Sequence, residues 1–334
     1  MKTLRLVLMV VLACVVAWGS RAVAEEKSWK GESVLFTKRA KDITFGDRVN
    51  GEQVSFPFFG RMPIKVRGER EGWLRIHDGH REGWADKADF VLVREAPAYF
   101  HRRVQADPKD SFALYMRGCG WQEKGEPDNA IKDFDECIRL DPTQSAYFNS
   151  RGVAWSDKKE YGKAIEDYGE AIRLDPKNAW AHFNRSVTRM LARRPGAAGG
   201  FQEVLDIQGW KGDRASYAVI LGHLAARQAA DEARAKRFLK DSAGKLVEVW
   251  PYPAVQFLRG EIDEPALLKL ATDDDKRTEA RCFLGLHRAL AGDKDEALAH
   301  FRWVKEHGTA SYIEYTIALA ELDRLERPPA KPKR

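Results

Sequence analysis

A run of three aspartates, Asp273–Asp275, is the clearest group of side chains that could bind a cation. Carboxylate oxygens are the ligands that hard cations prefer. Lys276 and Arg277 follow directly and oppose such binding, and an aspartate-rich loop ahead of a helix usually caps that helix. We therefore interpret the run as a helix cap and expect no metal here.

Histidine and cysteine spacing leads to the same expectation. His77 and His80 flank Asp78, but Asp78-Gly79 fits a hairpin turn, so a solvated loop is the simpler interpretation. A zinc site would need closely spaced cysteines, and the sequence has none. Its four cysteines are Cys14, Cys119, Cys137 and Cys282, of which the last three are expected in helices as small buried residues.

Motifs of known catalytic chemistry are missing from the sequence. It has no G-x-S-x-G, no H-E-x-x-H and no P-loop, and Gly118-Cys119-Gly120 lacks the third glycine of a dinucleotide fingerprint. We expect no catalytic residue, no cofactor and no enzymatic activity. The functional signal must then lie in elements that build a surface.

A period of 34 residues organises the middle of the chain. Pro108, Pro142 and Pro176 each follow an aspartate and stand 34 residues apart. Other residues recur in phase: Gly118 and Gly152, Trp121 and Trp155, Ala130 and Ala164, Phe134 and Tyr168. This period is typical of the tetratricopeptide (TPR) repeat, in which helical hairpins stack into a solenoid. The glycine lets the second helix approach, and the proline ends that helix.

We therefore predict a mainly α fold, a TPR helical-hairpin solenoid preceded by a small SH3-like β-barrel. The predicted parts are a signal peptide (1–24), the barrel (25–95), a capping helix with three TPR hairpins (96–210), further TPR-like hairpins (211–327) and a basic disordered tail (328–334).

The first 24 residues resemble an export signal. Lys2 and Arg5 precede the apolar run Leu6–Trp18, and Ala22–Ala24 fits a cleavage site before Glu25. We expect an exported protein, either periplasmic or secreted. In an alternative, residues 11–14 act as a lipobox, Cys14 is lipidated and the protein is attached to a membrane.

Net charge argues against nucleic acid as a partner. The whole chain carries +6, and cleavage after Ala24 would remove Lys2, Arg5 and Arg21 but no acid, which leaves +3. Such a mild charge is far from the concentrated basic surface of nucleic-acid-binding domains.

Short β-prone runs alternate with turn residues between positions 28 and 95, as expected for a small β-barrel. The runs are Ser33–Thr37, Gln53–Phe59, Pro63–Val66, Trp73–His77 and Phe90–Val93. The stretches Gly72–Ile76, Gly83-Trp84 and Lys87–Val91 resemble the end of bacterial SH3-like domains. That resemblance implies binding of cell-wall peptides or flanking protein segments. Trp73 and Trp84 would line the groove or, alternatively, pack in the barrel core.

The C-terminal half is similar to another family. The segments Trp250-Pro251, Phe257–Ile262, Phe283–Gly285, Glu314-Tyr315 and Ala320–Leu322 resemble the tail of the bacterial outer-membrane TPR lipoproteins of the NlpI type. The resemblance implies a homodimeric adaptor that docks peptidoglycan hydrolases and a periplasmic protease.

In TPR geometry the concave surface is lined by residues of each first helix that face away from its hairpin partner. This stripe comprises Phe112, Tyr115, Cys119 and Gln122 in the first repeat, Ala146, Asn149, Val153 and Ser156 in the second, and Trp180, Phe183, Val187 and Met190 in the third. Only Asn149 matches the Lys, Arg and Asn pattern with which some TPRs grip a chain terminus. The third repeat would instead bind an apolar anchor. Alternatively, later helices cover it and make it core.

Two functions are consistent with these features. The first is a non-enzymatic envelope adaptor that binds protein segments in a TPR groove and organises cell-wall enzymes. The second is a cell-wall-binding module in which the barrel holds peptidoglycan and the repeats are a spacer. The expected partners are envelope proteins or peptides, peptidoglycan in the second case, and a second copy of the chain.

Overall fold

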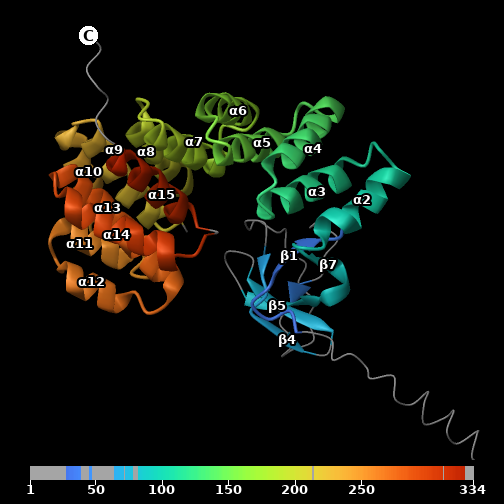
Figure 1. Cartoon of the computed structure of the whole chain (residues 1–334), viewed down its shortest axis with the longest axis horizontal. Helices are drawn as coiled ribbons and strands as arrows, with labels where there is room; N and C mark the ends of the chain where they lie inside the picture. Colours follow the sequence, from blue (N-terminus) through green and yellow to red (C-terminus); the bar gives the residue numbers. More distant parts are fainter. Residues whose placement is uncertain are drawn as a thin grey trace, which may run out of the picture. The chain divides into compact units, whose positions relative to one another are not determined.

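The structure is a computed structural model that describes residues 28–38, 45–46, 64–70, 72–77, 82–212, 214–310 and 312–327. The chain divides into two compact units, 1–96 and 97–334, each of which is taken by itself (Figure 1). The predicted signal peptide, Asp78, His80, the strand expected at 53–59 and the tail 328–334 lie outside the described residues.

The first unit contains two antiparallel sheets. One has the strand order β3 (Ile64–Lys65), β1 (Ser33–Phe36), β7 (Phe90–Leu92). The other has the order β2 (Phe45–Gly46), β6 (Glu82–Asp86), β5 (Trp73–His77), β4 (Gly68–Arg70). The short 3-10 helix η2 (Lys87–Asp89) joins β6 to β7, and the Asp86 side chain caps it. A small β domain ahead of the helices was expected, and these sheets agree with it.

Burial alternates along the central strands of the first unit. Leu74 and Ile76 of β5 and Ala85 of β6 are buried, whereas Arg75 between them is exposed. Successive side chains of a strand point to opposite faces, so this alternation identifies one face as core. Val34, Leu35 and Phe90 of the other sheet are also buried.

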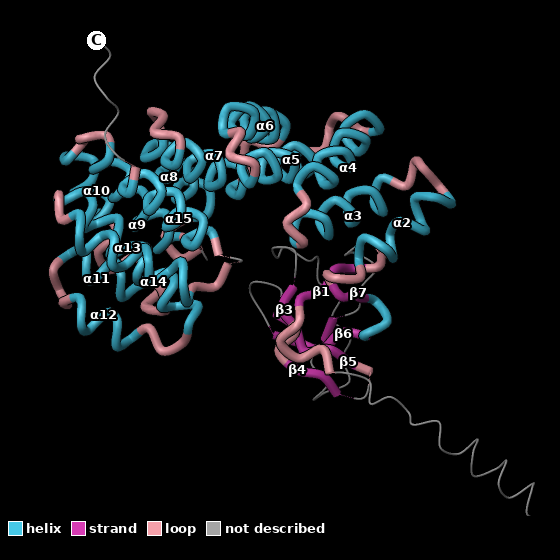
Figure 2. The backbone as a smooth tube through the Cα atoms, in the orientation of Figure 1, coloured by secondary structure: helices cyan, strands magenta, loops and turns pink. Residues whose placement is uncertain are grey.

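The second unit consists of helices joined by short turns (Figure 2). The helices of its first part are α2 (Ala96–Ala106), α3 (Ser111–Glu123), α4 (Pro127–Leu140), α5 (Ser145–Asp157), α6 (Tyr161–Leu174), α7 (Ala179–Leu191) and α8 (Ala197–Gln208). Those of the second part are α9 (Ala215–Gln228), α10 (Glu232–Asp241), α11 (Tyr252–Arg259), α12 (Glu264–Leu270), α13 (Asp274–Ala291), α14 (Lys294–His307) and α15 (Ile313–Glu326). The predicted helical hairpins are thereby confirmed.

A glycine facing an aromatic ring sets the spacing of four hairpins. The pairs are Gly118–Phe134, Gly152–Tyr168, Gly222–Phe238 and Gly285–Phe301, and a Cβ atom on each glycine would lie 2.6, 2.8, 2.5 and 2.5 Å from the ring. In α7–α8 the arrangement is reversed, because Gly200 on the second helix faces Ser186 on the first. A side chain at any of these glycines would push the two helices apart.

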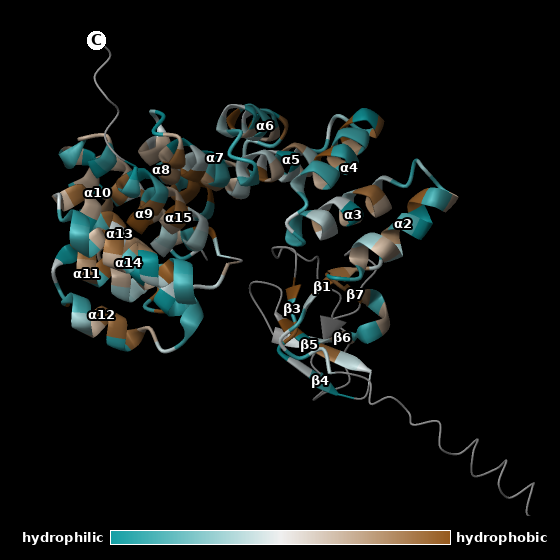
Figure 3. Cartoon of the chain, in the orientation of Figure 1, coloured by the Kyte–Doolittle hydropathy of each residue, from teal (hydrophilic) through white to brown (hydrophobic). Residues whose placement is uncertain are grey.

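The main hydrophobic core of the second unit lies among α7 to α15. In Figure 3, α8 and α9 carry much of the hydrophobic colour, and every residue of α9 from Ala218 to Ala226 is buried. A smaller cluster around Phe134 lies between α4 and its neighbours. Among the described helices none is long and apolar enough to cross a membrane.

Candidate functional site

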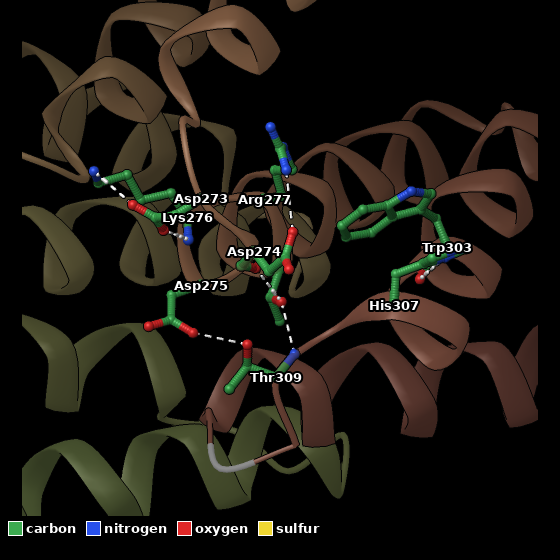
Figure 4. A network of polar contacts seen from close by, with 9 residues as sticks. Asp273, Asp274, Asp275, Lys276, Arg277, Trp303, His307 and Thr309 are labelled. Carbon is green, nitrogen blue, oxygen red and sulfur yellow. Dashed lines mark hydrogen bonds and ion pairs between the residues drawn. The ribbon is translucent and has the colours of Figure 1, made fainter. Parts of the chain in front are cut away.

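The aspartate run at the start of α13 is a helix cap. Asp273 Oδ1 accepts a hydrogen bond from the Lys276 backbone at 2.9 Å, and its other oxygen lies 2.8 Å from Lys276 Nζ. Asp274 pairs with Arg277 at 3.1 Å, and Asp275 accepts from Thr309 Oγ1 at 2.7 Å. Figure 4 shows these carboxylates directed to separate partners. Within the described ranges, no cluster of His, Cys, Asp and Glu is suited to a metal ion.

The three described cysteines are free thiols without nucleophilic character. Cys137 and Cys282 are fully buried, as expected, whereas Cys119 is only half-buried. Burial raises the pKa of the Cys119 thiol to about 12, so this group is protonated at neutral pH. Cys119 therefore acts as a neutral side chain of the concave stripe.

Trp73 and Trp84 lie on one face of the β4–β5–β6 sheet. Trp73 is paired with Asp86, and Arg75 with Trp84. Directly opposed residues project from the same face of a sheet, so both tryptophans lie opposite the face formed by Leu74, Ile76 and Ala85. Each is half-buried. The groove and barrel-core interpretations of these two residues both stay predictions.

The stripe is partly open in the first two repeats. None of its eight residues on α3 and α5 is buried, including Tyr115 and Asn149. The Tyr115 hydroxyl lies 3.1 Å from Ser150 Oγ of the next repeat, and Asn149 Oδ1 accepts from Asn184 Nδ2 at 3.2 Å. These contacts join the first helices of neighbouring repeats and leave the stripe residues between them partly accessible to solvent.

The same stripe is closed in the third repeat. Phe183, Val187 and Met190 are only 6%, 1% and 2% exposed and belong to the core shared with α9, α13 and α15. Trp180 is half-buried with the Arg214 guanidinium over its ring. The apolar anchor site expected at these residues is therefore corrected: the later helices cover it, which was the alternative interpretation.

The open stripe itself is uncharged, and an acidic residue follows it at the end of each helix. Glu123 and Asp157 end α3 and α5 at the same repeat position, and both are exposed. The eight stripe residues of these helices include no lysine or arginine. Lys124 and Lys158, the next residues, lie over the rings of Trp121 and Trp155. This surface lacks the cations needed to grip a carboxylate terminus.

A ladder of partly buried ion pairs links the helices of the first two repeats. Arg117 makes two hydrogen bonds to Asp133, at 2.9 and 2.6 Å, and Arg151 makes the same pair with Asp167, at 2.8 and 2.6 Å. Arg151 also reaches Asp135 of the preceding repeat at 2.7 Å. Sequence reasoning missed these roles, although Arg and Asp recur with the 34-residue period.

Comparison with known families agrees with the geometry. Residues 113–144 match the model described as tetratricopeptide repeat, and residues 156–188 match the model described as TPR repeat. A search of curated proteins finds no match.

Several solved structures are similar to parts of this chain. A tetratricopeptide repeat protein from Parabacteroides merdae is 14% identical and covers 70% of this chain and 93% of its own, with a TM-score of 0.48. MamA is 21% identical and covers 48% and 90%, with a TM-score of 0.42. The second TPR of Spaghetti (RPAP3), bound to the HSP90 peptide SRMEEVD, is 24% identical and covers 31% and 98%, with a TM-score of 0.29.

One family match falls on the hairpin α3–α4, and the other covers α6 and most of α7, so both lie in the region that carries the 34-residue period. The prediction of TPR repeats in this chain is confirmed.

Proposed function

We propose that the chain is a non-enzymatic protein-interaction scaffold that binds an extended partner segment along α3 and α5. The observation that carries this proposal is the contrast between repeats. The same four positions are partly open on α3 and on α5, but three of the four are buried on α7. A helical surface with mixed aromatic and polar side chains suits a peptide segment, which supplies its own anchors.

Selection from a random peptide library against the full chain tests this function. We compare binding of the selected peptides to Val153→Arg, on the stripe, and Glu166→Arg, an exposed position on α6. An arginine at position 153 should obstruct the stripe and weaken binding about tenfold or more. The Glu166→Arg variant should bind like the wild type. If both variants bind the selected peptides equally well, the peptides do not bind along the stripe of α3 and α5.

We further propose that the scaffold acts in a bacterial envelope as an adaptor for other envelope proteins. The export-signal pattern at 1–24 and the NlpI-type and SH3-like resemblances support this setting. Intact mass of the native protein tests it: a chain that begins at Glu25 agrees with export and cleavage, and a diacyl group on Cys14 agrees with a lipoprotein. A chain that retains Met1 without modification contradicts both.

The homodimer implied by the NlpI-type resemblance is tested by light scattering.

A second function, binding of cell-wall peptidoglycan by the first unit, is favoured by one observation. Trp73 and Trp84 share the sheet face opposite the core. A pull-down with purified sacculi compares the full chain with a Trp73→Ala, Trp84→Ala variant. Retention of the wild type alone would support this function, and absence of the wild type from the pellet would contradict it.

A further inference from the structure

A hollow of about 280 Å³ opens where two hairpin turns of the second unit meet. The turn between α7 and α8 contributes Arg193, Arg194 and Gly196. Gln228 at the end of α9 and Asp231 in the following turn lie opposite them in the lining. Arg234 of α10 completes the charged part of the wall, and alanines from α8 and α9 form the apolar part. The hollow lies away from the open stripe of α3 and α5 in the sequence and shares no residue with it.

Positive charge dominates this wall. Three arginines line it, and Asp231 is the single acid among the lining residues. A fourth guanidinium adjoins it, because a Cβ atom on Gly196 would lie 3.2 Å from Arg189 Nη1. A Cβ atom on Gly199 would likewise lie 4.0 Å from Arg234 Nη1. Guanidinium groups from two helices thus flank the first turn of α8.

The charges of these arginines are incompletely balanced by the protein. Arg193 pairs with Glu321 at 2.7 Å, and Arg234 lies 3.6 Å from Asp231. Asp231 also caps α10 by accepting from the Arg234 backbone. Arg189 and Arg194 form no ion pair with any residue in the described part of the chain. Burial, with a contribution from the Arg324 charge, lowers the pKa of Arg193, although Glu321 opposes this shift.

The start of α8 adds to the positive electrostatic potential of the hollow. Its N-cap is Gly196, at φ 88°, and no side chain caps the helix. Ala197 and Ala198 of this first turn line the hollow and are buried. Backbone N–H groups of a first helical turn carry partial positive charge, so they reinforce the arginines.

We propose that this hollow binds a phosphoryl group. The guanidinium fork matches phosphate oxygens in pairs, and a doubly charged anion would balance Arg194 at the wall and the adjoining Arg189. The site is independent of the scaffold function proposed for α3 and α5. The phosphoryl group can come from inorganic phosphate or from a phosphorylated side chain of a partner, and the experiment separates these two sources.

Isothermal titration of the full chain with inorganic phosphate, at constant ionic strength in chloride, measures the site directly. We expect saturable binding by the wild type and a loss of about tenfold or more in affinity for Arg194→Ala, since a charge-assisted hydrogen bond is lost. Arg194 is exposed and makes no ion pair with a described residue, so its removal should leave the fold intact. Arg237→Ala is the matched control, because Arg237 is an exposed arginine of α10 that does not line the hollow.

A phosphoserine peptide forms the second arm of the experiment. Tighter binding of the peptide than of phosphate would assign the site to a phosphorylated partner, and the reverse order to the free ion. Lack of saturable binding of both probes would overturn the proposal. So would equal phosphate affinity in the wild type, Arg194→Ala and Arg237→Ala, because the effect would then be a general response to anions.

Discussion

Gly152 and Gly169 show what a single missing side chain does in this fold. Both lie in the second repeat, on helices α5 and α6. A Cβ atom on Gly152 would lie 2.8 Å from the Tyr168 ring, and that ring is almost fully buried. A Cβ atom on Gly169 would meet nothing within 4 Å. Only the first glycine is required by packing; the second merely lowers the helix preference of α6.

We expect Gly152→Ala and Gly169→Ala to change the free energy of unfolding in opposite directions. In Gly152→Ala, overpacking against Tyr168 should lower the free energy of unfolding by about 1–3 kcal/mol. The higher helix preference of alanine should raise it by about 1 kcal/mol, so the variant should be destabilised on balance. Gly169→Ala should gain about 0.5–1 kcal/mol. Urea unfolding of both variants measures the difference, and a stabilised Gly152→Ala would show that the hairpin tolerates a wider spacing.

Helix caps allow a second comparison between equivalent residues. Asn178 accepts a hydrogen bond from the Ala181 backbone at the start of α7, whereas Gln144, at the same repeat position, makes no such cap on α5. Asn178→Ala should therefore cost about 1 kcal/mol of stability, and Gln144→Ala clearly less. Thermal unfolding followed by circular dichroism measures both. Equal losses would mean that the cap of α7 contributes little.

At the scale of whole elements, local patterns in the sequence were reliable and distant contacts were not visible. Glycine and aromatic residues 16 positions apart indicated the hairpins because a hairpin is a local structure. Phe183 packs against Phe201 of α8 and belongs to a core cluster that extends to α9, α13 and α15, which follow much later in the chain. No period relates Phe183 to those helices. The position of the open stripe could therefore be predicted from the sequence, but not the point at which it closes.

Packing of α9, α13 and α15 places Glu279 in the core. Its carboxylate accepts hydrogen bonds from Trp250 Nε1 at 2.7 Å and from the Tyr217 hydroxyl at 3.0 Å. Glu279 is 3% exposed, and Glu314 of α15, 2% exposed, lies close enough to act on it. Burial, followed by the charge of Glu314, raises the pKa of Glu279 to about 8.

The raised pKa of Glu279 makes the free energy of unfolding fall as pH rises. The folded chain retains a proton on Glu279 that the unfolded chain releases near pH 4.5, so the stabilisation is complete below that value and is lost as pH increases to about 8. Glu279→Gln, which mimics the protonated form, should flatten this dependence between pH 5 and 8. Thermal unfolding across that range tests it, with the exposed Glu306→Gln as control. An unchanged slope in Glu279→Gln would contradict the assignment.

At the scale of the whole molecule, the second unit combines a linear and a compact part. The hairpins α3–α4 and α5–α6 follow one another in a row, whereas α9 to α15 pack around a shared core (Figure 2). An ion pair joins the third repeat to the final helix, which lies much later in the sequence. Arg193 donates to both carboxylate oxygens of Glu321, at 2.7 and 2.8 Å. The last helix, α15, is thereby tied to the turn between α7 and α8, where the linear part meets the compact part.

Arg193 and Lys159 allow this link to be tested. They occupy equivalent turn positions with positive φ, 52° and 61°, where other hairpins have Gly125 and Gly292. Glycine should relieve strain at either position, by about 1 kcal/mol. Lys159→Gly should therefore be stabilising. Arg193→Gly should be destabilising on balance, because a hydrogen-bonded ion pair worth about 1.5–3 kcal/mol is lost.

Hydrogen exchange locates the effect within the molecule. In Arg193→Gly we expect faster exchange of amide protons in α7, α8 and α15, which the ion pair joins, and unchanged exchange in α3 and α4. Such a pattern follows from a repeat array in which each hairpin contacts mainly its neighbours, so that loosening one end leaves distant hairpins intact. Uniformly faster exchange throughout the second unit would show instead that the linear and compact parts unfold together.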